Sequence, residues 1–192
     1  MKTRRVLVTG AGSGVGETLA RQLALAGHEL VVTDLDGAAA ERVAAAIVAD
    51  GGQAQAFRLD VTQAAEVERV IAAAQPVDVL VNNAGLQNVA PLAEFPPEKW
   101  QLLVNVMLVG PALATRAALP GMRARNFGRI VNVGSIHSLV ASAYKSAYVA
   151  AKHGLLGLAK TVALETGDCD VTINTICPAY LRTPLVEKQI AD

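Results

Sequence analysis

The sequence predicts an α/β fold, a doubly wound parallel sheet in a three-layer α/β/α arrangement. Short apolar segments alternate with longer helical patterns along the 192 residues. Of these residues 52% are hydrophobic, 18% are charged and only 4% are aromatic. The core must therefore consist mainly of Ala, Val, Leu and Ile, which suits strands buried on both faces between helices.

Six short apolar segments are expected to form strands, and five helical patterns lie between them. The expected strands are 5–9, 30–33, 54–59, 77–81, 129–133 and 171–176, and the helices 15–26, 38–49, 63–74, 98 to about 123, and 144–166. Pro111 lies inside the fourth helix, where we expect a bend or a local change in hydrogen bonding. Repeated strand–helix units imply parallel strands with right-handed crossovers. No linker or repeat divides residues 1–192, so we expect a single domain.

Charge and cysteine content argue against several classes of protein. The 17 acidic and 17 basic residues balance, and no basic tract favours nucleic acid. Cys169 and Cys177 lack metal-ligand spacing and fit a reducing cytoplasm, so we expect no metal. The basic start lacks the apolar stretch of a signal peptide. The charge-free run between Lys99 and Arg116 contains polar residues, so it predicts a buried helix and not a membrane span.

A glycine-rich loop connects the first predicted strand to the first helix. Gly10, Gly14 and Gly16 form its key set, and Gly12 is an additional glycine. Glycines permit a tight turn and a close approach of the backbone to a pyrophosphate, while the helix offers free N–H groups. The loop predicts a dinucleotide site of the Rossmann type, although a purely structural glycine turn is the alternative.

Asp34 ends the second predicted strand, where a carboxylate can accept hydrogen bonds from an adenosine ribose. A 2′-phosphate would meet a like charge there, and no Arg or Lys stands at Thr33 or in the glycine loop. Asp34 therefore favours NAD over NADP. The alternative is a turn aspartate at the start of a helix.

Polar residues also follow the third and fourth strands. Asp60 precedes Val61 and could bond the adenine edge, while Asn83 could contact a ribose or join neighbouring strands. For Asn82 the structural role is the favoured interpretation. Ligands bind at the carboxyl ends of strands in such sheets, where these groups are expected.

Tyr148 and Lys152 are four residues apart on one helix face, thirteen residues after Ser135. A phenol titrates near pH 10, so Tyr148 needs a nearby positive charge to act as an acid or base near neutrality. Lys152 is placed to supply it, and Ser135 to donate to a substrate oxygen. Asn105, a polar residue in an apolar run, could hold a water that links Lys152 to solvent. Each residue alone has a structural explanation, but the set predicts proton transfer to or from an alcohol.

These motifs resemble those of the classical short-chain dehydrogenases/reductases, over the whole chain. The resemblance implies that Asn105, Ser135, Tyr148 and Lys152 form a catalytic tetrad and that members assemble as tetramers. It also implies that the segment from Pro178 to Thr183 lines the nicotinamide side. The cofactor-binding set it implies is Gly10, Ser13, Gly14, Val15, Gly16, Asp34, Asp60, Val61, Asn83, Tyr148, Lys152, Pro178, Leu181 and Thr183.

The stretches 142–154 and 182–190 are similar to those of the bacterial D-3-hydroxybutyrate dehydrogenases within that family. This resemblance implies an NAD-dependent oxidation of (R)-3-hydroxybutyrate to acetoacetate. A small hydroxy acid needs its carboxylate anchored so that its C–H bond faces the nicotinamide. The implied substrate-binding set is Gln87, Ser135, His137, Lys145, Tyr148 and Gln189. Another secondary alcohol as substrate, or NAD binding without catalysis, remains an alternative.

The chain departs from the family pattern in two places. Ala179 stands where a glycine commonly follows Pro178, which puts the local cofactor geometry in doubt. The chain also ends at Asp192, whereas the family continues through a lid helix, a further helix and a seventh strand. We therefore expect a C-terminally incomplete domain, with an unpaired edge on the sixth strand.

Overall fold

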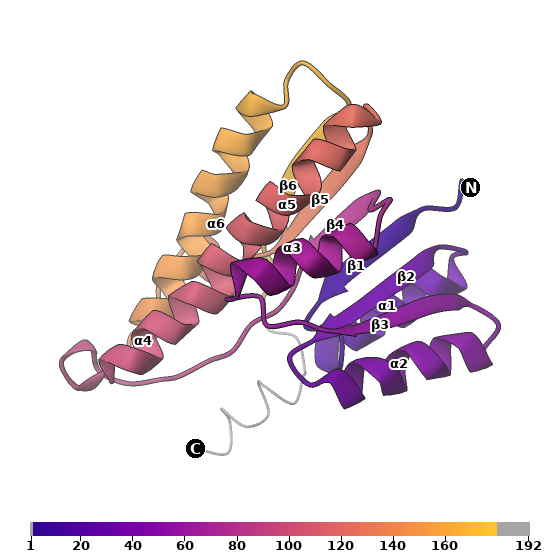
Figure 1. Ribbon diagram of the computed structural model, residues 1–192. Helices are drawn as coiled ribbons and strands as arrows, with labels where there is room; N and C mark the ends of the chain where they lie inside the picture. The colour runs from indigo at the N-terminus through magenta and orange to yellow at the C-terminus, as the bar shows by residue number, and fades with distance from the viewer. Residues whose placement is uncertain (1, 180–192) are drawn as a thin grey trace.

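The computed structural model describes residues 2–179, which form a six-stranded parallel sheet with helices on both faces (Figure 1). The strand order is β3-β2-β1-β4-β5-β6. The strands are β1 (Arg5–Thr9), β2 (Glu29–Asp34), β3 (Gln53–Arg58), β4 (Val79–Asn82), β5 (Gly128–Val133) and β6 (Val171–Ile176). This arrangement confirms the predicted α/β fold and all six strands.

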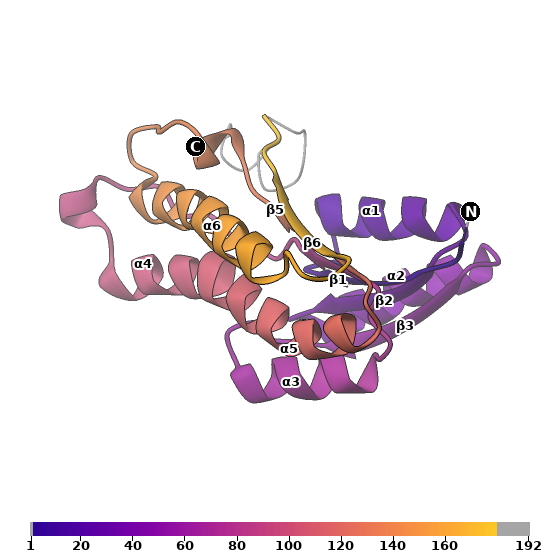
Figure 2. The ribbon, with the colours of Figure 1, turned by 90° about the horizontal axis from the view of Figure 1, so that it is seen from above.

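The α-helices are α1 (Gly14–Leu25), α2 (Gly37–Ala49), α3 (Ala64–Ala73), α4 (Pro97–Val104), α5 (Gly110–Ala124) and α6 (Ser146–Glu165). Figure 2 shows α1 on one side of the sheet and α3 and α5 on the other. Buried residues alternate along β1, so that Val6 and Val8 pack with α1 and α2, while Leu7 packs with α3, α5 and α6. This alternation follows from the two-residue period of a strand, and it buries the sheet on both faces.

The fourth predicted helix is interrupted by a π-helical turn, Asn105–Val109, between α4 and α5. The Gly110 N–H bonds the Asn105 carbonyl oxygen, five residues earlier. Pro111 explains the turn, because its ring would clash with the carbonyl of Met107 in a regular helix and it offers no N–H. The expected change in hydrogen bonding is thus confirmed.

The stretch Pro97–Ala124 is long and apolar enough to cross a membrane by length and composition. Among residues 2–179 it is the one helix that passes this test. Its buried side chains, which include Leu103, Met107, Ala114 and Met122, pack into the core. Packing within the fold buries 39% of its most apolar 18-residue window.

The predicted start of the last helix is wrong by two residues, because α6 begins at Ser146 and not at 144. Tyr144 has φ of 66°, a left-handed conformation that cannot continue a right-handed helix. The Tyr144 carbonyl instead accepts a hydrogen bond of 3.0 Å from the Ala90 N–H. This bond ties the segment before α6 to the segment after β4.

Candidate active site

A cavity of about 500 Å³ lies at the carboxyl ends of the strands. It is bordered by the glycine loop, the ends of β2, β4 and β5, the π-helical turn and the first turns of α6. Most of the predicted site residues line it: Gly10, Ser13, Gly14, Val15, Asp34, Asp60, Val61, Asn83, Gln87, Ser135, His137, Lys145, Tyr148, Lys152 and Pro178.

The glycine loop has the backbone conformations that its composition predicts. Gly10 and Gly14 have φ of 63° and 55°, which side-chain-bearing residues rarely adopt. A Cβ atom on Gly10 would lie 2.7 Å from the Ala84 Cα atom. A Cβ atom on Gly16 would collide with the Gly10 carbonyl oxygen, so glycine at this position allows the loop to pack closely. Gly16 itself does not line the cavity.

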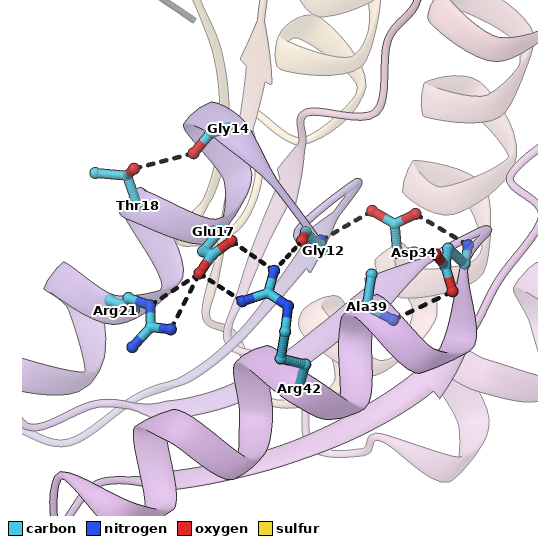
Figure 3. A network of polar contacts seen from close by, with 9 residues as sticks. Gly12, Gly14, Glu17, Thr18, Arg21, Asp34, Ala39 and Arg42 are labelled. Atoms are coloured by element: carbon cyan, nitrogen blue, oxygen red, sulfur yellow. Dashed lines mark hydrogen bonds and ion pairs between the residues drawn. The ribbon is translucent and has the colours of Figure 1, made fainter. Parts of the chain in front are cut away.

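Gly12 has a structural role that the sequence analysis did not assign to it. Its N–H donates a 2.8 Å hydrogen bond to Asp34 Oδ2 (Figure 3). A Cβ atom here would lie 2.8 Å from the Ala39 Cβ atom and 2.9 Å from the Asp34 carboxylate. The close approach of the loop to Asp34 therefore requires glycine at this position.

Asp34 ends β2 with its carboxylate held at both oxygens. Oδ2 accepts from the Gly12 N–H, and Oδ1 accepts a 3.0 Å bond from the Asp36 N–H. A carboxylate has about four acceptor sites, so capacity remains for a further donor. The side chain lines the cavity, as a ribose-binding role requires.

An arginine side chain lies closer to the Asp34 end of the cavity than the sequence indicated. Arg42 of α2 donates to the Gly12 carbonyl oxygen and to both oxygens of Glu17, at 2.7 to 3.0 Å. The residues near position 34 in the sequence do not predict this contact, because it depends on how α2 packs.

The two asparagines at the end of β4, Asn82 within the strand and Asn83 just after it, hold strands together. Asn82 Nδ2 donates to Asn132 Oδ1 of β5 at 2.9 Å, which agrees with the structural role favoured for it. Asn83 Nδ2 donates to the carbonyl oxygens of Thr9 and Gly10 at 3.0 and 2.9 Å. Thr9, which the sequence interpretation did not single out, accepts at Oγ1 from the Asn83 and Ala84 N–H groups. These bonds fix the end of β4 against the glycine loop.

Asp60 lies two residues beyond the end of β3. Its Oδ1 accepts from the Thr62 N–H at 2.9 Å and from the Thr62 hydroxyl at 2.7 Å. This turn orients the Asp60 carboxylate beside Val61 on the cavity wall.

Tyr148 and Ser135 lie side by side in the cavity. A hydrogen bond with Ser135 lowers the pKa of the Tyr148 phenol, but burial raises it more, so that the net shift is upward. Lys152, which the sequence analysis expected to lower this pKa, is not among the groups that shift it. The Lys152 Nζ atom lies 5.6 Å from the centre of the Tyr148 ring.

Lys152 is buried and donates to the carbonyl oxygen of Val133 at the end of β5. Burial lowers the pKa of its ammonium group from 10.5 to about 8, since removal from water penalises the charge. Its amine therefore titrates close to the physiological range.

His137 is buried beside Tyr148, with ring centres 5.9 Å apart in an edge-to-face arrangement. Its Nε2 lies 2.7 Å from Ser142 Oγ, and its backbone N–H donates to Ser135 Oγ at 3.1 Å. Burial, and then the charge of Lys145, lower the pKa of the imidazole. A neutral imidazole has one N–H, and both ring nitrogens face serine hydroxyls, since Nδ1 also lies 3.4 Å from Ser135 Oγ.

Gln87 and Lys145 line the cavity with His137, from the segments after β4 and before α6. The Gln87 side-chain oxygen accepts from the Asn88 N–H at 3.1 Å, which leaves its NH₂ group as a donor. The structure thus brings together three of the predicted carboxylate-binding residues.

Asn105 lies apart from the other predicted site residues. Asn105 does not line the cavity, and its Oδ1 accepts a 2.9 Å bond from Gln101 Nε2. Leu181, Thr183 and Gln189 lie outside the described residues. Ala179 lines the cavity beside Pro178, whose carbonyl oxygen accepts from the Ile136 N–H at 2.7 Å.

Residues 4–192 match the family model of the short chain dehydrogenases, and the chain belongs to this family of oxidoreductases. It is 45% identical over 191 residues to a D-beta-hydroxybutyrate dehydrogenase of Cupriavidus necator, covering 97% of this chain and 74% of the relative. It is 43% identical over 196 residues to a D-beta-hydroxybutyrate dehydrogenase of Rhizobium meliloti (99% and 76%). It is also 38% identical over 185 residues to a cyclohexanol dehydrogenase of Acinetobacter (94% and 74%). The predicted family resemblance is confirmed, and with it a nicotinamide dinucleotide as the class of cofactor.

Proposed function

We propose that the chain transfers a hydride between NAD and a small 3-hydroxy acid, with (R)-3-hydroxybutyrate and acetoacetate as the substrate pair. One observation carries the proposal: Tyr148 and Lys152 share a single cavity with the glycine loop and Asp34. A cofactor site and a proton-transfer site that open into each other are what alcohol oxidation requires.

The residues present fit a dinucleotide. Glycine at positions 10 and 16 lets the loop pack tightly, since a Cβ atom at either would meet backbone atoms, and the N–H groups at the start of α1 would then face a pyrophosphate. Asp34 would hold the adenosine ribose, and its charge disfavours a 2′-phosphate, which supports NAD over NADP. Arg42 does not offset this charge, because its guanidinium group faces Glu17 and Gly12. The nicotinamide, when bound, supplies the hydride acceptor and a positive charge.

Each catalytic residue has a role in the proposal that follows from its position. Tyr148, as the phenolate, takes the proton of the substrate hydroxyl group. Ser135 donates a hydrogen bond to the oxygen as negative charge develops on it. Because burial raises the pKa of Tyr148, ionisation of the phenol depends on added positive charge, which Lys152 and the oxidised nicotinamide would supply. Asn105 is proposed as the outer end of a proton path to water.

The substrate carboxylate is assigned to the charged and polar rim of the cavity. Lys145 would supply charge, and Gln87 and His137 would donate hydrogen bonds. The hydroxybutyrate dehydrogenases among the relatives support this choice of acid. The cyclohexanol dehydrogenase supports the second candidate, a neutral secondary alcohol.

A substrate panel with a Lys145→Ala variant tests the proposal. The wild type should oxidise (R)-3-hydroxybutyrate with NAD far better than cyclohexanol or 2-butanol. Lys145→Ala should raise KM for the acid about 10- to 100-fold, since a charge-assisted contact is lost, and Lys160→Ala, which removes an exposed lysine of α6, should not. An unchanged KM in Lys145→Ala, or a preference for the neutral alcohols, would overturn the carboxylate anchor. NAD binding without turnover of any substrate would favour a non-catalytic role.

The same proposal includes residues 1–192 as one dinucleotide-binding and catalytic domain, a homotetrameric assembly and a cytoplasmic location. Support for assembly comes from a second, largely apolar hollow between α5 and α6, lined by Leu119, Leu158 and Val162 among others. Light scattering on the purified protein tests the tetramer directly, and a monomer at micromolar concentration would contradict it.

A further inference from the structure

The backbone of Gly12 is held on both sides by side chains of opposite charge. Its N–H donates to Asp34 Oδ2 at 2.8 Å, and its carbonyl oxygen accepts from Arg42 Nη2 at 2.7 Å (Figure 3). Asp34 lies at the end of β2, and Arg42 lies in α2. The two peptide groups that meet at Gly12 are thus each fixed to another element by a charge-assisted hydrogen bond.

Glu17 fixes the orientation of the Arg42 guanidinium group. Arg42 Nη1 and Nη2 donate to the two Glu17 carboxylate oxygens at 3.0 and 2.8 Å, a bidentate pairing. Glu17 lies in the first turn of α1, which directly follows the loop. This ion pair holds the Arg42 guanidinium group within hydrogen-bonding distance of the Gly12 carbonyl oxygen.

Arg21 belongs to the same network but does not contact the loop. Its Nε and Nη2 donate to Glu17 Oε1 at 3.1 and 3.0 Å. The chain therefore offers two arginines that share one carboxylate, of which only Arg42 bonds Gly12. This difference separates an effect on the loop from a general effect on the ion-pair network.

We propose that Arg42 is a positioning residue for the cofactor, which holds the Gly12–Ser13 peptide group so that Ser13, Gly14 and Val15 face the pyrophosphate. The inference rests on the proposed cofactor role of the loop. Ser13, Gly14 and Val15 follow Gly12 directly and line the cavity, whereas Arg42 does not. Arg42 therefore acts through the backbone, and it shares Gly12 as a hydrogen-bond partner with Asp34, the proposed ribose-binding residue.

The test is direct binding of NADH, by fluorescence, and of ADP-ribose, by calorimetry, to the whole chain. Arg42→Ala should bind both about 10-fold more weakly, the order of one charge-assisted hydrogen bond, and should raise KM for NAD with kcat within about twofold of wild type. Arg42→Lys should recover part of the affinity, because an ammonium group can still reach one of the two acceptors. Arg21→Ala should bind both ligands as the wild type does.

Equal affinities of wild type and Arg42→Ala, or an equal loss in Arg21→Ala, would overturn the inference while leaving the proposed function intact. A wild type that binds neither NADH nor ADP-ribose would instead remove the proposed function, and this inference with it. If Arg42→Ala fails to fold, Arg42→Lys and Arg42→Gln answer the same question, since wild-type affinity in both variants contradicts the role.

Discussion

The buried ammonium group of Lys152 donates a hydrogen bond to the carbonyl oxygen of Val133, across the contact between α6 and β5. This bond ties the helix that carries Tyr148 to the strand that leads to Ser135. It also places a cation in a site poor in water, where burial lowers its pKa to about 8. The link between the helix and the strand that carry the proposed proton-transfer residues therefore has an energetic cost.

Replacement of Lys152 by Met should raise the free energy of unfolding near pH 7 while abolishing activity. A folded-state pKa of about 8, against 10.5 in the unfolded chain, means that the unfolded state binds the proton more tightly. The penalty, on the order of 3 kcal/mol, is fully present below pH 8 and fades as the pH rises toward 10.5. The gain in the variant is smaller than this, because the Val133 carbonyl loses its partner.

Urea denaturation between pH 7 and pH 10.5 measures the difference. The wild type should approach the variant in stability as the pH rises, whereas Lys160→Met, at an exposed position, should show no such convergence. A gap that does not depend on pH would contradict the lowered pKa.

Tyr148→Phe should reduce kcat for hydroxybutyrate oxidation by about 100- to 10,000-fold, the range of general acid–base catalysis. NADH affinity should change little, since the ring stays in place. Tyr144→Phe is the matched control, because Tyr144 is 59% exposed and lies four residues before Tyr148. Steady-state kinetics decide the matter, and near-normal turnover in Tyr148→Phe would remove the tyrosine from the mechanism.

Gly16→Ala and Gly157→Ala should shift stability in opposite directions. A Cβ atom at Gly16 collides with the Gly10 carbonyl oxygen, so the loop must move, at a cost of about 1–3 kcal/mol and with loss of NADH binding. A Cβ atom at Gly157 meets no atom within 4 Å, and alanine there should stabilise α6 by up to about 1 kcal/mol. Thermal melts with and without NADH report both effects, and a Gly16→Ala protein of normal stability and affinity would be inconsistent with the loop geometry.

Asp34→Asn should reduce the discrimination between NAD and NADP about 10-fold or more. The substitution removes the charge that repels a 2′-phosphate, while the amide oxygen can still accept from Gly12. Asp36→Asn is the control, since Asp36 is an exposed cap of α2 and asparagine caps equally well. The readout is the ratio of dissociation constants for the two cofactors, and no change in Asp34→Asn would count against ribose recognition by this carboxylate.

The elements of the sheet were predictable because their signals are local. The strands at 5–9 and 171–176 were placed to the residue, since each is an apolar segment bounded by polar or glycine residues. Pro111 likewise predicted a local change in its helix, because proline disrupts the hydrogen bonding of the turn that contains it. The start of α6 was missed, since nothing local forces Tyr144 into φ of 66°. That conformation accompanies the bond between its carbonyl oxygen and Ala90, more than fifty residues earlier in the chain.

The site divides in the same way. By itself the sequence determined which residues gather at the carboxyl ends of the strands, because strand ends and residue spacing along a helix are properties of the local chain. Only the tertiary structure decided which hydrogen bonds Arg42, Gly12, Lys152 and Asn105 make. Arg42 reaches the loop because α2 packs beside α1. The charged form of Lys152 is destabilised because α6 buries the side chain against β5. Hydrogen-bond partners and pKa shifts depend on distances between elements remote in sequence, which the order of residues does not express.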